Sequence, residues 1–113
     1  MSSNIKNSVQ LIGNIGKDPE LSTFDGGKTR LSFSLATNDY YTNAKGEKVK
    51  QTDWHNIIVW GKMAEIMHKH VMKGHEIAVQ GKLSSRTYTD KAGANKYITE
   101  VIVSDYYAIH RQD

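Results

Sequence analysis

Cysteine is absent from this sequence of 113 residues, and proline occurs once. A chain without cysteine forms no disulfide and offers no thiolate for catalysis, for zinc or for an iron–sulfur cluster. No apolar run approaches the ~20 residues that a membrane helix needs, and the polar start, residues 1–6, lacks the apolar segment of a secretory signal. We therefore expect a soluble protein of the cytoplasm, with no membrane partner and no cofactor.

The sequence also lacks a large excess of either charge. The chain carries 15 Lys and Arg against 12 Asp and Glu, a formal net charge of +3, and no basic arm or acidic tail stands out. Such a balance permits an anionic partner without requiring one. The length suits a single domain, since domains most often contain about 100–150 residues. Any argument for function must therefore come from where the charged side chains lie relative to the aromatic ones.

Short strand-like segments, separated by glycine and polar residues, make up most of the chain. Residues 9–13 open a first strand, and the glycines and the proline of residues 13–19 end it. Residues 31–35 alternate apolar and serine side chains, which is the period-two pattern of a half-buried strand. Residues 42–50 are expected to form a loop. Residues 50–60 are expected to form a third strand, rich in β-branched and aromatic side chains.

The hydrophobic period changes after Gly61. Apolar residues then recur at steps of three and four, at Met63, Ile66, Met67 and Val71. This spacing predicts one amphipathic helix, ended by Gly74. Strand character returns at residues 76–88 and 97–103, on either side of a polar turn. The order of three strands, a helix and two strands predicts an all-β fold with one helix: the five-stranded Greek-key OB-fold barrel, with the helix between strands 3 and 4.

The third predicted strand carries the most informative pattern. Alternation places Trp54 and Trp60 on one of its faces and His55 on the other. Two large rings on one face favour a stacking platform over a place in the core. Single-stranded nucleic acid is bound by such rings, at ~1–3 kcal/mol for each stacked base, together with a cationic groove that follows the phosphates.

The fourth predicted strand adds basic and aromatic side chains to this pattern. Ile77, Val79 and Leu83 have the parity of the core. The side chains left on the opposite face are those of Gln80, Lys82, Ser84, Arg86 and Tyr88. A bulge at Gly81 would reverse this assignment. The loops expected at 42–50 and 89–96 carry lysines and are long enough to act as flexible fingers around a bound strand.

The sequence offers little evidence for a phosphate-binding loop, a metal site or a catalytic site. Residues 61–62 follow a strand and open a helix, but the other residues of a phosphate-binding loop are missing. Residues 13–16 resemble a GXXG clamp, which needs flanking helices, so these glycines are expected to serve a turn. His68 and His70 lie two residues apart on the helix and point to different sides, so they do not share a metal ion. We predict no catalytic site and no metal site. A small enzyme that uses the histidines is the weakest alternative.

Several spaced motifs carry a family likeness. They appear in order at residues 11–20, 33–37, 51–55, 60–66, 73–74, 80–83 and 97–101. Together they resemble the bacterial single-stranded-DNA-binding protein (SSB) family. The resemblance implies an OB-fold protein, not an enzyme, that assembles as a homotetramer. It also implies binding of single-stranded DNA without sequence preference in replication, recombination and repair, and hence a place on the nucleoid in the cytoplasm.

The resemblance also implies site residues. The family's stacking aromatic residues match Tyr41, Trp54, Trp60 and Tyr88. The family's basic residues that face phosphate match Lys62, Lys73 and Arg86. His55 matches a position associated with subunit contacts, which agrees with the alternation that directs it away from the tryptophans.

The end of the sequence departs from the typical family pattern. Bacterial members usually continue into a flexible linker and an acidic tip that recruits replication and repair enzymes, whereas this sequence stops at Asp113. We therefore expect one OB-fold domain over residues 1–113, without recruitment through a tail; a trimmed chain and a naturally short relative both fit. Two further alternatives stay open. One is an OB-fold module that bridges protein partners and holds DNA weakly, and the other is RNA binding, because stacking platforms accept any base.

Overall fold

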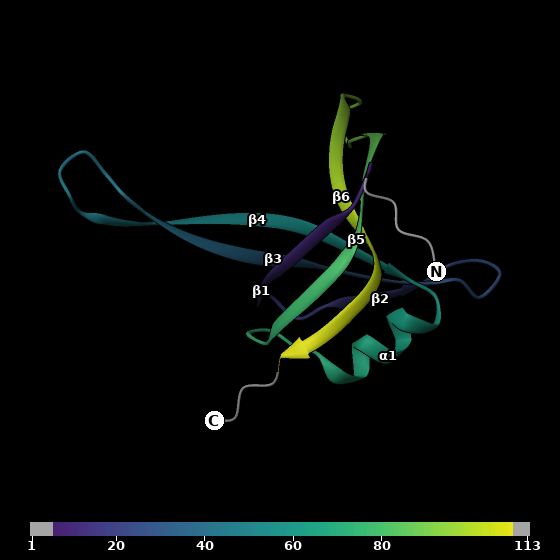
Figure 1. Ribbon diagram of the computed structural model, residues 1–113. Helices are drawn as coiled ribbons and strands as arrows, with labels where there is room; N and C mark the ends of the chain where they lie inside the picture. The colour runs from purple at the N-terminus through teal and green to yellow at the C-terminus, as the bar shows by residue number, and fades with distance from the viewer. Residues whose placement is uncertain (1–5, 110–113) are drawn as a thin grey trace.

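The computed structural model describes residues 6–109, and the strands in it curl into a barrel from which long arms project (Figure 1). The ends of the predicted domain, residues 1–5 and 110–113, lie outside the described residues. The elements are β1 (Val9–Ile15), β2 (Glu20–Thr23), β3 (Thr29–Thr42), β4 (Lys48–Trp60), α1 (Lys62–His70), β5 (Glu76–Thr89) and β6 (Asn95–Ile109).

Five of the strands close the barrel. The strand order is β1-β5-β6-β4-β3-β2, and β1 pairs with β3 as well, through Asn14 with Ala36 and Ile15 with Leu35. This last pairing joins the two ends of the sheet, while β2 lies outside the ring as an antiparallel partner of β3. β4 and β6 pair in parallel and the other neighbours antiparallel. The predicted OB-fold barrel is therefore confirmed, with α1 between its third and fourth strands once β2 is left out of the count.

The core lies inside the ring and is closed at one end by α1. Leu31 and Leu35 of β3, Ile57 and Val59 of β4, and Ile77 of β5 are fully buried, so each inward position follows the alternation of its strand. The helix adds Ala64 and Met67, and Val71 follows directly after it. Burying one such aliphatic side chain contributes about 1.5–3 kcal/mol.

Two apolar side chains lie outside this core, contrary to the sequence pattern. Ile66 is 41% exposed on the outer side of α1. Leu83 keeps the inward parity of β5, but it is 50% exposed, because it lies past the last buried positions of that strand.

Among the described residues, no helix has both the length and the apolar character needed to cross a membrane.

Both predicted loops are short turns at the ends of long hairpins. β3 and β4 pair as far as Thr42 with Lys48, and β5 and β6 as far as Thr89 with Asn95. Each turn is held by one side chain: the Oδ1 of Asn43 accepts hydrogen bonds from two backbone N–H groups, and the Oδ1 of Asp90 does the same. The fingers expected around a bound strand are therefore paired β-arms (Figure 1).

Two glycines inside strands allow backbones to approach closely. A Cβ added to Gly13 would collide with the carbonyl oxygen of Ala36, where β1 meets β3, so Gly13 serves barrel closure and the predicted turn role is wrong for it. A Cβ on Gly81 would collide with the carbonyl oxygen of Ile102. The register shift beside Gly81 leaves Ser104 of β6 as the extra residue, so the parity of β5 is not reversed.

Gly13→Ala is expected to lower the free energy of unfolding by about 1–3 kcal/mol, because the added methyl group meets fixed backbone at the closure of the barrel. Urea unfolding measures this change. The matched control is Gly16→Ala, whose added methyl group meets the exposed ring of Trp54, which can turn aside at smaller cost. Unchanged stability in Gly13→Ala would contradict the role given to the β1–β3 contact.

Candidate nucleic-acid interface

The two tryptophans lie on one outer face of the barrel. In the β3–β4 ladder Trp54 is opposite Ala36 and Trp60 is opposite Arg30, so both rings project from the side that carries Ser32 and Ser34. Trp54 is 61% exposed and Trp60 is 42% exposed. The face predicted from alternation is therefore where the structure places both rings, and neither ring belongs to the core.

Trp54 packs across the chain that follows β1. A Cβ added to Gly16 would lie 2.8 Å from Cη2 of Trp54, so the ring rests directly against the backbone of that glycine. The N–H of Gly16 donates to the carbonyl oxygen of Ser34 at 2.9 Å, which fixes this backbone against β3. The contact supports one side of the Trp54 ring and leaves the rest of the ring open to solvent.

Trp60 belongs to a cluster that the sequence analysis did not find. Its ring centroid lies 6.0 Å from that of Phe24, at an interplanar angle of 40°. The guanidinium carbon of Arg30 lies 6.0 Å from the Trp60 centroid, and the Nζ of Lys28 lies 5.9 Å from it. All three neighbours come from β3 or from the turn between β2 and β3. The sequence contained one indication of this cluster: Arg30 lies two residues before Ser32 and four before Ser34, so alternation places all three on one face of the strand.

A groove of about 290 Å³ runs over the same face between the tryptophans. Its lining includes the side chains of Lys17, Arg30, Ser32, Ser34, Asn56, Ile58 and Arg86. Ile58 is only 6% exposed although it faces outward, which makes it part of the floor. The carboxylates of Asp18, Glu20 and Glu100 line it as well, so the groove combines an apolar floor with hydroxyl, amide, cationic and acidic groups along its sides.

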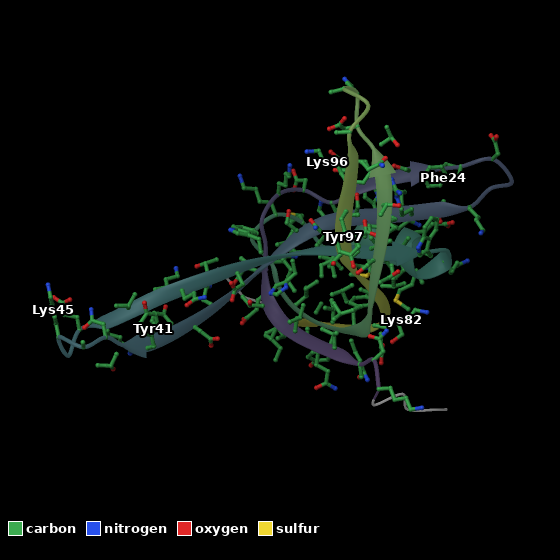
Figure 2. The ribbon with its side chains drawn as sticks, turned by 90° about the horizontal axis from the view of Figure 1, so that it is seen from above. Phe24, Tyr41, Lys45, Lys82, Lys96 and Tyr97 are labelled. Carbon is green, nitrogen blue, oxygen red and sulfur yellow. The ribbon has the colours of Figure 1, made fainter. Side chains whose placement is uncertain are left out.

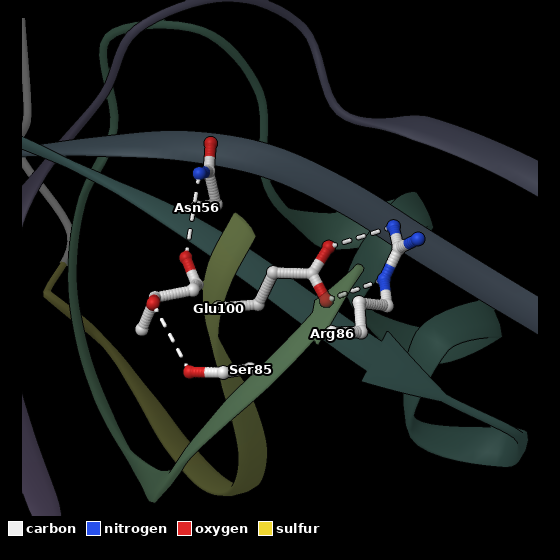
Figure 3. Close-up of polar contacts among 5 residues, drawn as sticks. Asn56, Ser85, Arg86 and Glu100 are labelled. Carbon is white, nitrogen blue, oxygen red and sulfur yellow. Dashed lines mark hydrogen bonds and ion pairs between the residues drawn. The ribbon is translucent and has the colours of Figure 1, made fainter. Parts of the chain in front are cut away.

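Arg86 is held in the groove by a buried carboxylate (Figure 3). Its Nε donates to Oε1 of Glu100 at 3.1 Å and its Nη2 donates to Oε2 at 3.2 Å. The Glu100 side chain is 7% exposed and that of Arg86 is 51% exposed. These hydrogen bonds, together with the charge of Glu100, raise the pKa of Arg86. Part of its guanidinium is therefore engaged within the protein and part is open to a ligand.

The strands around this ion pair are tied together by polar side chains (Figure 3). Asn56 of β4 donates through Nδ2 to the carbonyl oxygen of Thr99 at 3.4 Å. The hydroxyl groups of Ser85 and Thr99 lie 3.1 Å apart and share a hydrogen bond. These contacts connect β4, β6 and β5 at the level of Arg86, and so position its side chain relative to Trp54 and Trp60.

The four predicted stacking residues do not all share one face. Tyr88 is on the side of β5 that carries Arg86, whose guanidinium carbon is 5.9 Å from its ring centroid, and it is 45% exposed. Tyr41 pairs with Val49, so alternation places its side chain on the face of the β3–β4 arm opposite to that of Trp54. Its neighbour Tyr40 shares the parity of Trp54 and has the Nζ of Lys48 5.2 Å from its ring centroid.

The remaining predicted site residues do not line the groove. Lys62 begins α1, two residues after Trp60, and is exposed. Lys73 is also exposed, and its backbone N–H donates at 3.0 Å to Asp18, which does line the groove. His55 is half-buried on the side away from Trp54, with its Nε2 3.0 Å from the hydroxyl of Thr37. Residues 6–109 contain no group of three or more His, Cys, Asp or Glu placed to hold a metal ion.

Two curated proteins are similar to this chain in sequence. A curated single-stranded DNA-binding protein of Bacteroides thetaiotaomicron is 45% identical over 101 residues, which are 88% of this chain and 63% of that protein. Single-stranded DNA-binding protein 1 of Chlorobaculum tepidum is 35% identical over 108 residues, which are 95% of this chain and 67% of that protein. The chain thus spans somewhat less than two thirds of the length of the Bacteroides protein.

Solved structures agree with these relatives. The Plasmodium falciparum SSB in complex with ssDNA matches with a TM-score of 0.86 at 32% identity, over 97% of this chain and 100% of that one. A deletion mutant of the single-stranded DNA binding protein from Thermus aquaticus matches with a TM-score of 0.81 at 26% identity, over 92% of this chain and 50% of that one. Since the family model described as "Single-strand binding protein family" matches residues 6–109, the chain belongs to that family.

Proposed function

We propose that this chain binds single-stranded DNA, without reading its sequence, on the face that carries Trp54, Trp60 and the groove between them. This surface is called the binding face below. The observation that carries the proposal is the pair of exposed tryptophans on one strand, beside a groove whose lining includes Lys17, Arg30 and Arg86. The match to an SSB in complex with ssDNA supports the same assignment.

Stacking supplies contacts that any base can make. Each base that stacks on Trp54, Trp60 or Tyr88 contributes about 1–3 kcal/mol, and every base offers a π-face, so the binding is tolerant of sequence. On the β3–β4 arm, Tyr40 lies on the same side as Trp54. Tyr41 takes a base only where the DNA passes around the arm to its other side.

Cationic side chains supply the attraction for phosphate. Arg86 lines the groove, and Lys62 and Lys73 are exposed, so the proposal gives all three to the DNA backbone. Neutralising phosphates releases counterions, and the affinity therefore falls as salt rises. The proposal includes no catalytic step, and both curated relatives are named as DNA-binding proteins. Its cellular setting is the nucleoid in the cytoplasm, where replication, recombination and repair expose single strands.

The proposal includes self-association as a homotetramer. Outside the binding face, Ile12 of β1 and Tyr107 of β6 are 59% and 72% exposed, and they border a second groove of about 490 Å³ over β1, β5 and β6. Large exposed apolar side chains beside a groove are typical of a contact surface. His55 also faces away from the tryptophans, which suits its proposed role in subunit contacts.

Replacing both tryptophans tests the stacking role. Trp54→Ala with Trp60→Ala is expected to weaken binding to oligo-dT about 30-fold or more, since two stacks are lost at ~1 kcal/mol or more each. Fluorescence anisotropy with a labelled oligonucleotide measures the affinity, and circular dichroism checks the fold. The control is Tyr97→Ala, which removes a ring that is 72% exposed on the other side of the β5–β6 arm. Near-native affinity of a folded double variant would remove the stacking assignment.

Light scattering coupled to gel filtration tests the assembly. We expect a mass near four times the 12.7 kDa of one chain. Ile12→Glu is expected to reduce that mass, because it places a charge on the exposed apolar surface. Trp54→Ala, which alters the binding face only, is the matched control and should leave the mass unchanged. A monomer in the unaltered protein at micromolar concentration would contradict the proposed tetramer.

A further inference from the structure

The hairpin of β2 and β3 carries a second combination of ring and cation beyond Trp60. Phe24 lies at the turn of this hairpin and is 41% exposed. In Figure 2 it stands at the opposite end of the molecule from Tyr41 and Lys45. The guanidinium carbon of Arg30 lies 4.9 Å from the Phe24 centroid and 6.0 Å from that of Trp60, so one cation contacts two rings.

Arg30 differs from Arg86 in how its charge is balanced. Arg86 is paired with Glu100, whereas no hydrogen bond or ion pair found within residues 6–109 uses the side chain of Arg30. Its Nε is buried and has no hydrogen-bond partner. Two aromatic rings hold the guanidinium in place instead of a carboxylate. No ion pair in the described chain neutralises Arg30 or Lys28, so both can bind an anion, with Glu20 as an acidic neighbour of Arg30 in the groove.

These side chains continue the binding face. Ser22 of β2, Arg30 of β3 and Trp60 of β4 are aligned in register, so Arg30 and Trp60 share one side of the sheet. Arg30 also lines the groove that leads back toward Arg86. Rings and cations thus occur along one path from Trp54, through the groove, to Trp60 and then to Phe24, and the carboxylates of Asp18, Glu20 and Glu100 also lie in the groove.

We propose that Phe24, Lys28 and Arg30 form a further nucleotide subsite, the hairpin subsite. It rests on the proposed function and extends the path of the single strand past Trp60. A base stacks on the exposed side of Phe24, and the phosphate between this base and the one on Trp60 is bound by Arg30 and Lys28. If the cluster only supported the ring of Trp60, no nucleotide would contact Phe24.

Photocrosslinking tests this contact directly. The probe is an oligo-dT in which 5-iodo-deoxyuridine replaces thymidine, irradiated with the intact protein and followed by tryptic digestion and mass spectrometry. Phe24 is the sole aromatic residue of the tryptic peptide 18–28, while both tryptophans lie in peptide 51–62. We expect crosslinks to both peptides, and loss of the first in Phe24→Leu. Crosslinks to peptide 51–62 alone would overturn the hairpin subsite and leave the proposed function standing.

The dependence of affinity on salt tests the two cations. For single strands the slope of log K against log salt changes by about 0.7 for each phosphate contact. Arg30→Gln and Lys28→Gln are each expected to reduce the slope by about 0.7. Phe24→Leu is expected to weaken binding about five-fold or more, with the slope unchanged, because it removes stacking only. The control is Lys69→Gln, which removes an equal charge from an exposed position on α1.

The outcomes separate the two proposals. If Arg30→Gln and Lys28→Gln behave like Lys69→Gln while Trp54→Ala still weakens binding, the hairpin subsite is overturned and the binding face is retained. If the unaltered protein does not bind oligo-dT, both proposals fail together. Circular dichroism checks that every variant is folded, so that affinities are compared only among folded proteins.

Discussion

The close contact of β1 with β3 is the constraint on which the rest of the structure depends. The ring of five strands closes through two pairs of residues, and it can do so because Gly13 has no side chain to separate the strands. Closure defines an inside and an outside for every strand. Once Ile57 and Val59 point inward, Trp54 and Trp60 have to point outward, so the exposure of the two rings is a consequence of how the barrel closes.

The charges of the binding face divide into two groups. Arg86 is tied to the buried Glu100 and so has a fixed position but a partly balanced charge. Arg30 is held by two rings and forms no ion pair in the described chain, although Glu20 lines the same groove. Although the net charge is only +3, several cations and rings lie along one path on this surface, together with the carboxylates of Asp18, Glu20 and Glu100. The arrangement suits a polyanion whose bases are unpaired and free to stack.

The sequence was sufficient to predict much of the barrel and one part of the site. Alternation placed Trp54 and Trp60 together because that strand is half-buried, with one face in the core, and a period of two then fixes both faces. The helix was predicted for a related reason, although Ile66 shows that an apolar residue at helical spacing can still face water. Family motifs added the assembly and the role of His55, which remain proposals.

What the sequence did not reveal depends on contacts between distant segments. The strands of the β5–β6 arm were predicted almost to their turn, but the extension of β3 to Thr42 was not, because residues 36–42 show no apolar alternation and their pairing with β4 is visible only in the register. For the same reason the sequence did not separate Tyr40 from Tyr41. The requirement for glycine at position 13 comes from the carbonyl of Ala36, and the cluster of Phe24, Arg30 and Trp60 joins two strands and the turn between β2 and β3.

Intrinsic tryptophan fluorescence tests the central claim most directly, because both tryptophans of the chain lie on the binding face. The protein is titrated with oligo-dT of about 60 nucleotides, near the upper span of four OB folds at ~4–16 nucleotides each, and in parallel with duplex DNA of the same length. The account predicts strong quenching by the single strand alone, saturating near one oligonucleotide per four chains. Neither quenching nor binding by the single strand at moderate salt would contradict it.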